Sequence, residues 1–476
     1  MQEQTIVPRD TDYSKWYHSV IDGADLLSET DTPGCMIMNP NCWAIWERIQ
    51  RVFDERIKET GHRNAQYPLL IPRSYIESEA EHVDGFAPEL AQITEMKGKK
   101  LDDPLVLRPT SETIIHTDMA KKVKTRDDLP ILLNQWANVF RMEMKPRPLL
   151  RSFEFFWQEG HTAHAEEEEA QEEVLRMLVQ YQEFIEQTLA IPCVTGEKSA
   201  IERFAGADRT FTAETMMQDI KALQSATSHN LGTTFSKAFG ISFEEDEQEH
   251  FAHLTSWGMS TRIIGATIMS HSDDKGLVLP PNIAPTQAVL LGMPKASMST
   301  EKLEAYQGRV TSALRNGLGI RFEVDNAGGR IGKKHFKWEK YGVPLRLVVG
   351  EKEIDKQEVM VVRRDTSEKI MLSIDNLDQL NVMLGEMQQG LFDQSAQRLA
   401  NNSMEIDDYV DVKSEFKKGN KFVYTGWAGT AEDEKQLKKS TGITIRCVPL
   451  EKKTDFPTCF MTGKPAQEQV LLAKAY

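Results

Sequence analysis

Residues 131–164 read ILLNQWANVFRMEMKPRPLLRSFEFFWQEGHTAH, and with LVLRP at 105–109 they form a continuous β-like region. Aromatic and branched residues are frequent in it, as they are in sheet strands. Charged residues such as Arg141, Glu143 and Glu159 stand within or beside this apolar text. A charged group in such a setting must be paired within the protein or must serve a ligand. The region therefore predicts sheet strands whose charged side chains are either paired within the protein or bind a ligand.

Helices and further strands surround this region. Asn39 can cap a helix that has Pro40 in its first turn and an apolar stripe up to about Thr60. The segment AQYPLLIP at 65–72 predicts a short strand, and HFAHLTSWGMS at 250–260 predicts a strand that leads into the helix TRIIGATIMSH. Strands beside helices without strict βαβ alternation predict an antiparallel α+β sheet domain over residues 1–283.

The pattern changes after the proline-rich joint LPPNIAP at 279–285. Short apolar runs alternate there with helices expected over 300–316 and 330–341, which predicts an α/β domain over residues 284–403. Residues 404–476 contain two further β-like runs, KFVYTGW and TIRCVPL. We expect them to form a third, smaller α+β unit.

Composition bounds the class of protein. A chain of 476 residues suggests roughly three domains at about 150 residues each. No apolar run is long enough to cross a bilayer, and the five cysteines form no CxxC pair, so we expect a cytoplasmic protein without a membrane partner. The net charge of −15 gives no bulk attraction for nucleic acid, although local basic patches can still bind phosphates.

Common cofactor motifs are missing from the sequence. GGRIGKK lacks the glycine spacing of a Walker A loop, and no GxGxxG follows a strand. His161 with His164, and His250 with His253, are spaced by three, which on a strand directs the two rings to opposite faces. We therefore expect no zinc at either pair.

A set of polar residues on the predicted strands remains to be explained. A salt-bridged core network would account for any one of them, because ion pairs also occupy protein interiors. A shared anionic ligand is the more economical interpretation of the whole set. Its members are Thr110, Glu112, Arg141, Glu143, Arg151, Glu159, His161 and Arg262.

The order of the motifs along the chain resembles that of the class II aminoacyl-tRNA synthetases, and within them the prolyl-tRNA synthetases of archaeal and eukaryotic type. The resemblance covers essentially the whole chain. Motif 1 corresponds to the helix from Asn41 with AQYPLLIP, motif 2 to NVFRME, MKPRPLL and RSFEF, and motif 3 to SWGMSTR. LRPTSE, FWQEGHTAH, ATSHNLG and the terminal Tyr476 match the prolyl enzymes in particular.

The resemblance implies an ATP-dependent ligation of L-proline to tRNA(Pro) by way of prolyl-adenylate, in a homodimer, with Mg²⁺ on the ATP phosphates. Arg141 would stabilise the α-phosphate and Arg262 the γ-phosphate, since a guanidinium suits charge that develops on phosphorus. Further contacts with ATP are implied for Glu143, Ser152, Phe155, Gln224, Thr227 and Ser260. Contacts with proline are implied for Thr110, Glu112, Trp157, Glu159, His161, Phe204 and His229.

Residues 284–403 resemble an anticodon-binding domain, and GGRIGKKHFKWEK at 328–340 is its basic segment. Basic residues at such spacings often form only a solvated helix face. In an acidic chain, however, phosphate contacts would have to be concentrated in such a stretch. The residues that we expect to bind tRNA are Arg330, Lys333, Lys334 and Lys337; Lys340, Arg363 and Arg364 lie nearby.

Two departures from the family pattern carry predictions. The segment between His164 and Trp257 is too short for a large editing insertion, so we expect no editing in cis and some mischarging with cysteine or alanine. Cys447 and Cys459 alone cannot close a tetrahedral zinc site, so we expect no structural zinc. Two alternatives remain open at this point: a sister synthetase with another amino acid, and an idle paralogue that only binds RNA or a partner.

Overall fold

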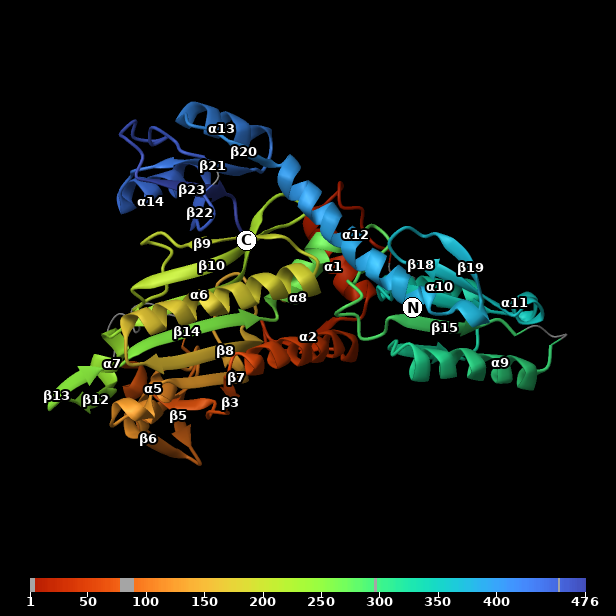
Figure 1. The fold of residues 1–476 in the computed structure, drawn as a ribbon, viewed down its shortest axis with the longest axis horizontal. Helices are drawn as coiled ribbons and strands as arrows, with labels where there is room; N and C mark the ends of the chain where they lie inside the picture. Colours follow the sequence, from red (N-terminus) through yellow and green to blue (C-terminus); the bar gives the residue numbers. More distant parts are fainter. Residues whose placement is uncertain (1–4, 78–89, 295–297, 453) are drawn as a thin grey trace.

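An 11-stranded sheet joins the N-terminal and C-terminal parts of the chain in this computed structural model, which describes residues 5–77, 90–294, 298–452 and 454–476 (Figure 1). Its order is β20-β21-β23-β22-β9-β10-β11-β14-β8-β7-β3, antiparallel except at the β20–β21 and β3–β7 pairs. The strands are β3 (Arg63–Asn64), β7 (Ile131–Phe140), β8 (Glu154–His164), β9 (Cys193–Glu197), β10 (Arg209–Met216), β11 (Ala222–Gly232), β14 (His253–Ser260), β20 (Ser403–Glu405), β21 (Phe422–Trp427), β22 (Thr444–Pro449) and β23 (Glu468–Ala473).

The strands predicted from residues 131–164 are confirmed as β7 and β8, which lie next to the β3 edge of the sheet. Alternate side chains of β8 face opposite sides, so Trp157, Glu159 and His161 share one face. Trp257 of β14 lies opposite Gly160 of β8, and a Cβ on that glycine would come within 2.1 Å of the indole ring. Glycine at 160 is therefore what lets the tryptophan lie flat against the sheet.

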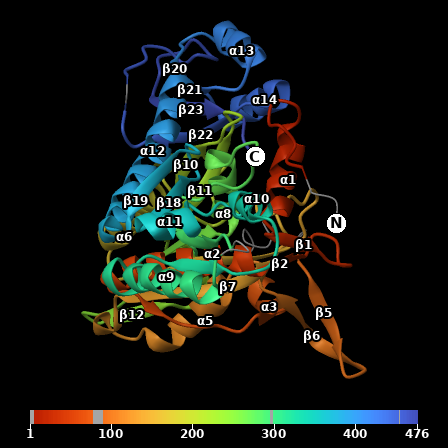
Figure 2. The same ribbon diagram turned by 90° about the vertical axis from the view of Figure 1, so that its right-hand side faces the viewer.

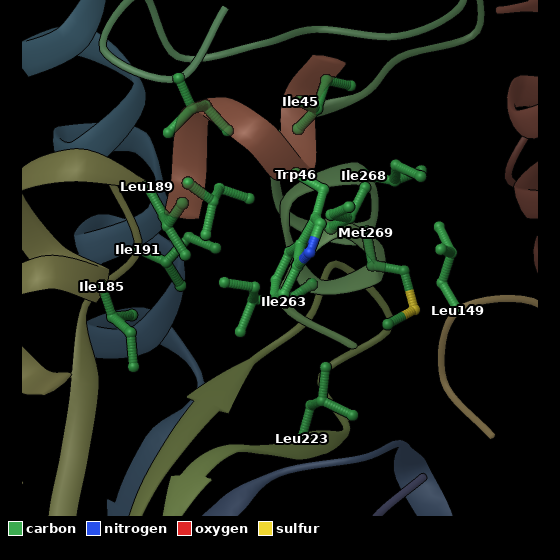
Figure 3. Close-up of a cluster of buried hydrophobic side chains, with 14 of the residues drawn as sticks. Ile45, Trp46, Leu149, Ile185, Leu189, Ile191, Leu223, Ile263, Ile268 and Met269 are labelled. Atoms are coloured by element: carbon green, nitrogen blue, oxygen red, sulfur yellow. The ribbon is translucent and has the colours of Figure 1, made fainter. Parts of the chain in front are cut away.

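Four helices pack on the catalytic part of the sheet, and they share one apolar core (Figure 3). In Figure 3, Trp46 of α2 lies among Ile263, Ile268 and Met269 of α8. The helix predicted from Pro40 is confirmed, but Asn39 does not cap it with its side chain; its amide donates to Asp25 and Ser28 instead. The helices are α1 (Tyr13–Gly23), α2 (Pro40–Glu59), α6 (Glu167–Glu183), which η3 (Phe184–Thr188) continues, and α8 (Arg262–His271).

Smaller elements surround this core. The prediction that AQYPLLIP forms a strand holds only for its last three residues, and these pair with β6 in a three-stranded sheet. Figure 2 shows β5 and β6 projecting from the body of the molecule. These elements are β1 (Leu27–Glu29), β2 (Met36–Met38), β4 (Leu70–Pro72), α3 (Arg73–Glu77), β5 (Gln92–Met96), β6 (Lys99–Leu107), α5 (Glu112–Lys122), η2 (Arg126–Asp128), α7 (Thr234–Phe239), β12 (Ser242–Glu245) and β13 (Gln248–Phe251).

The predicted α/β domain forms a separate five-stranded sheet of order β16-β15-β17-β18-β19. Its first three strands are parallel neighbours, and the last two join them antiparallel. Both predicted helices are present, as α9 with η4 and as α10. The elements are β15 (Ala288–Gly292), α9 (Thr300–Ser312), η4 (Ala313–Gly317), β16 (Phe322–Asp325), α10 (Ile331–Lys340), β17 (Leu345–Val349), α11 (Glu351–Lys356), β18 (Glu358–Arg363), β19 (Lys369–Ser373), η5 (Ile374–Asn376) and α12 (Gln379–Asn401).

The C-terminal unit, with α13 (Tyr409–Lys418) and α14 (Ala431–Thr441), extends the catalytic sheet. Its strand β22 pairs with β9 of the catalytic part, Val448 opposite Glu197. The predicted α+β unit is confirmed; besides the two predicted runs, which form β21 and β22, it contains β20 and β23, and its sheet is continuous with the larger one. Within the described residues, no helix has both the length and the apolar character that crossing a bilayer requires.

Candidate active site

A single cavity of about 240 Å³ brings most of the predicted site residues together on one face of the large sheet. All of the residues predicted to bind proline line it. So do most of those predicted to bind ATP, whereas Glu143 and Ser152 are not among its lining residues. The predicted residues that line it are Thr110, Glu112, Arg141, Phe155, Trp157, Glu159, His161, Phe204, Gln224, Thr227, His229, Ser260 and Arg262.

Glu159 organises the floor of the cavity from the middle of β8. It accepts hydrogen bonds from Ser111 Oγ at 2.5 Å and from Gln135 Nε2 at 2.7 Å, and it contacts His161 Nε2 at 3.1 Å. Burial opposes the charging of His161, but the hydrogen bond with Glu159 and the charges of Glu112 and Glu159 together raise its pKa. Because its carboxylate already makes these contacts, Glu159 holds Ser111, Gln135 and His161 in position rather than offering a free carboxylate to a ligand.

Thr110 and Glu112 enter the cavity where α5 begins. Glu112 occupies the first turn of that helix and is 3% exposed, and the Thr110 hydroxyl donates to its carboxylate. No lysine or arginine forms an ion pair with Glu112 among the described residues. A buried carboxylate that no lysine or arginine pairs is a group that a cationic ligand would complete.

Two arginines form the cationic part of the cavity. Arg141 donates to the carbonyl of Pro109 at 2.9 Å, and Arg262 donates to the carbonyl of Leu150 at 3.1 Å. Burial, together with the positive charges of Arg151 and Arg141, lowers the pKa of Arg262 to about 10. The guanidinium is still charged at neutral pH, and cations held near one another in this way suit a polyanion.

Aromatic rings also line the cavity. The Arg141 guanidinium lies 5.5 Å from the ring centre of Phe155 and 5.4 Å from that of Trp157. Phe204 and His229 lie 4.6 Å apart, with their planes tilted by 30°. Burial and the nearby His161 lower the pKa of His229 to about 3, so its ring is neutral and packs as an apolar wall.

Several buried polar atoms at the cavity have no hydrogen-bond partner in the described part of the chain: Trp157 Nε1, His161 Nδ1 and Ser256 Oγ. A buried polar atom without a partner is costly, so such atoms commonly await a ligand or water. No group of three or more His, Cys, Asp or Glu residues in the described ranges has the geometry to hold a metal. His164 bonds to Thr162 on the opposite face of β8 from His161, as the spacing predicted.

The sequence also missed or misplaced some residues. Glu202 lines the cavity from a loop, a position that no strand pattern could have revealed, whereas Trp257 and Ser256 lay within the recognised string SWGMSTR. Ser152 lines a second cavity instead, and the side chain of Arg151 is 47% exposed. Arg151, predicted to be one of the polar residues on the sheet strands, therefore lies before β8 at the surface instead.

The basic segment of the α/β domain is only partly available for RNA. Lys334 is 8% exposed, and its Nζ donates to the Asp325 carbonyl at 2.8 Å. Arg364 is 1% exposed and bonds to both carboxylate oxygens of Asp273. Lys334 therefore does not belong to a free basic surface, because it ties α10 to β16. Arg330, Lys333 and Lys337 remain exposed.

Comparisons with known proteins agree with this architecture in every part of the chain. The family descriptions "tRNA synthetase class II core domain (G, H, P, S and T)", "Anticodon binding domain" and "Prolyl-tRNA synthetase, C-terminal" match residues 94–271, 283–380 and 409–476. Proline–tRNA ligases of a Roseiflexus species and of Porphyromonas gingivalis are 44% and 43% identical, over 100% and 99% of each chain.

A solved prolyl-tRNA synthetase structure also has the same fold as this chain. Prolyl-tRNA synthetase from Cryptosporidium parvum, complexed with L-proline and AMP, matches with a TM-score of 0.94 and 35% identity over 100% of this chain and 98% of its own. The same enzyme with halofuginone and AMPPNP gives a TM-score of 0.95.

The antiparallel sheet, the arginine pair and the matched core domain define a class II aminoacyl-tRNA synthetase. Within that class, identity of 44% over the full length shows that the chain belongs to the prolyl-tRNA synthetase family. Its reaction is the ATP-dependent ligation of L-proline to tRNA(Pro), by way of prolyl-adenylate and with release of pyrophosphate.

Proposed function

We propose that the acidic end of the cavity selects proline. Glu112 supplies the countercharge to the secondary ammonium, and Thr110 supplies a hydroxyl beside it. Trp157, Phe204 and His229 enclose the apolar ring. Glu159 and His161 hold these groups in place through the hydrogen bonds of Glu159. The observation that supports the assignment most directly is the buried Glu112 carboxylate in the same 240 Å³ cavity as two arginines.

The cationic end then takes ATP. Arg141 would stabilise charge on the α-phosphate and Arg262 would hold the γ-phosphate. Phe155 offers a ring for adenine, Glu143 lies near the arginines, and the ribose side is formed by Gln224, Thr227 and Ser260. Ser152 faces the second cavity, so we assign it no contact with adenine. Mg²⁺ enters with ATP and takes oxygen ligands mainly from the phosphates.

In this arrangement the reaction requires no nucleophile from the protein. The proline carboxylate attacks the α-phosphorus and pyrophosphate leaves; the tRNA 3′ hydroxyl then attacks the mixed anhydride. The protein contributes alignment of the reactants and charges placed where negative charge develops. That is consistent with a cavity lined by both arginines and carboxylates.

ATP–pyrophosphate exchange with each of the twenty amino acids in turn tests the assignment. Proline should support exchange far above the others. A sister synthetase would respond best to another amino acid, and an idle paralogue would respond to none. Weak exchange with cysteine or alanine is also expected, because apolar walls discriminate by only about 1–3 kcal/mol per methylene.

For tRNA, we propose that Arg330, Lys333 and Lys337 contact phosphates. All three are exposed on or beside α10, next to Phe336, whose side chain is 62% exposed. Exposed cations next to an exposed ring suit a single-stranded nucleic acid, which offers both phosphates and base faces. The salt dependence of tRNA binding measures how many phosphates are contacted.

The remaining assignments concern type and assembly. We propose an enzyme without an editing insertion, since residues 165–252 fold entirely into α6, η3, strands β9 to β13, α7 and the loops between them. We also propose a cytoplasmic homodimer that uses the motif 1 segment around α2, and domain boundaries near 283/284 and 403/404. The molar mass in solution tests the dimer.

A further inference from the structure

The loop of residues 198–208, between β9 and β10, connects the proline site to the C-terminal unit. None of its residues lies in a helix or strand. Glu202 and Phe204 in this loop both line the cavity. A loop without regular hydrogen bonds needs side-chain contacts to hold a fixed shape, and here these contacts come from two sides.

On the inner side, the loop is bound to the catalytic sheet. The backbone N–H of Phe204 donates to Thr210 Oγ1 at 3.0 Å, and the same hydroxyl lies 3.0 Å from His229 Nδ1. The rings of Phe204 and His229 are in contact, with centres 4.6 Å apart. These contacts fix Phe204 itself. The turn from Ser199 to Glu202 is closed by the Glu202 N–H, which donates to the Ser199 carbonyl at 3.2 Å, and its side chains are held by other groups.

On the outer side, helix α14 of the C-terminal unit supplies those groups. Ser199 Oγ donates to Glu434 Oε1 at 2.7 Å, and Lys438 Nζ donates to Glu202 Oε1 at 2.9 Å. Glu434 is 4% exposed, whereas the side chain of Lys438 is 56% exposed. Glu434 and Lys438 are separated by four residues, so they lie on the same face of α14.

A buried ion cluster anchors the start of the same loop. Lys198 Nζ donates to Glu214 Oε1 of β10 at 2.7 Å, and Arg446 of β22 lies 2.9 Å from Glu214 Oε2. The two cations bring the pKa of Glu214 down to about 2 despite its burial. This cluster joins β22 of the C-terminal unit to the loop and fixes the position from which α14 reaches it.

The charges explain why Lys438 matters to the turn. Burial raises the pKa of Glu434, and the nearby Glu202 carboxylate raises it further, while Lys438 and Lys198 lower it. Two acidic groups thus lie close together, with Lys438 as the exposed cation beside them. Without that cation, the two carboxylates would repel each other and the turn that carries Glu202 would lose its ionic contact with α14.

We propose that Glu434 and Lys438 are positioning residues for the proline site, which they serve by holding the turn at 199–203 in place. The C-terminal unit then acts on amino-acid binding as well as completing the sheet. This inference rests on the proposed proline pocket, and in particular on Phe204 as part of its wall. Neither residue touches the cavity itself.

The test measures KM for proline and for ATP by pyrophosphate exchange in full-length variants. Glu434→Ala should raise KM for proline about ten-fold, since hydrogen bonds to charged or buried groups carry effects of that size. Lys438→Ala should raise it about two- to five-fold, as expected of an exposed pair. KM for ATP should stay within two-fold in both variants.

Conservative variants and a control separate positioning from general damage. Glu434→Gln keeps an acceptor for Ser199 and Lys438→Arg keeps the charge, so both should return KM for proline to near the parent value. Lys439→Ala, on the same helix and exposed, should change nothing. Melting temperatures of all variants show whether the fold is preserved.

Two results would overturn the inference: KM values for proline and ATP that rise together, or an unchanged KM for proline in both alanine variants while Phe204→Ala raises it. If Phe204→Ala also leaves KM for proline unchanged, the pocket assignment itself fails. The two failures can therefore be told apart.

Discussion

The catalytic cavity and the basic helix α10 both looked like anion sites in the sequence, and they differ in what the fold does with their charges. In the cavity, Arg141 donates to the carbonyl of Pro109, and Arg262 donates to the carbonyls of Leu150 and Gln224. Near α10, Lys334 and Arg364 are each neutralised by an aspartate. The basic side chains near α10 thus form ion pairs that hold the fold, whereas the arginines of the cavity line a space that a ligand can enter.

We expect the largest effect, a loss of stability, from removing a basic side chain that forms a buried ion pair. Arg364→Ala removes a buried guanidinium that bonds to Asp273 and to the carbonyls of Leu277 and Glu339. We expect the free energy of unfolding to fall by about 3–5 kcal/mol, because Asp273 loses its partner. Urea denaturation measures this. A stable variant with weakened tRNA binding would instead make Arg364 a phosphate ligand.

Arg262→Ala removes an arginine of the cavity, and we expect it to lower activity rather than stability. We expect proline-dependent pyrophosphate exchange to fall about 10²- to 10³-fold, the size found when a group that stabilises transition-state charge is removed. Stability should change little, because two cations near each other repel. Arg262→Lys should recover only part of the rate, since an ammonium cannot bond in two directions in a plane. Exchange within three-fold of the parent in Arg262→Ala would contradict the assignment.

Glu112→Gln tests whether the charge of this carboxylate is needed to bind proline. The change keeps shape and removes charge, so proline activation should fall about ten-fold or more, equivalent to about 1.4 kcal/mol. ATP binding should be nearly unchanged, which equilibrium binding can verify. An unaltered KM and kcat for proline would remove Glu112 from the site.

On α10 we expect a smaller effect, and only from exposed lysines. Lys333→Ala with Lys337→Ala should raise KM for tRNA about three- to ten-fold and reduce its salt dependence, with roughly one unit of slope lost per phosphate contact. Exchange without tRNA should be unchanged. Lys334→Met serves as the matched comparison, since it should lower stability without altering that slope. Normal charging by the double variant at all salt concentrations would make this a solvated face.

We expect the smallest effect on activity from a change at Tyr476, which contacts both an aspartate and an arginine. The Tyr476 hydroxyl donates to Asp219 at 2.7 Å, and Arg151 of the motif 2 loop donates to the Tyr476 backbone oxygen at 3.4 Å. Deleting residues 474–476 should lower aminoacylation about two- to five-fold and leave the melting temperature nearly unchanged. Full activity in the truncated protein would mean that the terminus does not order this loop.

The strands and helices could be predicted because their signals are local. The three-residue spacing of His161 and His164 predicted that the two rings lie on opposite faces of a strand, and they do so on β8. Periodicity likewise predicted α2, α8 and α10 to within a few residues. The strings around Arg141, Glu112 and Arg262 then predicted one shared site, and the cavity does bring these residues together.

Which charges are paired could not be predicted, because pairing depends on partners that lie far away in the sequence. Arg364 meets Asp273, 91 residues away, and Arg446 meets Glu214, 232 residues away. The residues that neighbour a basic side chain in the sequence do not reveal whether its partner is an aspartate or a phosphate. The same limit hid Glu202, whose place in the cavity depends on a loop.

Periodicity in the sequence by itself predicted most of the helices and strands, and short motifs that resemble a known family indicated the class of fold and candidate residues for proline and ATP. The tertiary structure decided that the C-terminal unit shares the catalytic sheet through β22 and β9, that Lys334 serves the core, and that Glu434 and Lys438 reach a loop of the active site. These outcomes depend on which surfaces meet when the chain packs, and burial and charge pairing over long separations control that choice.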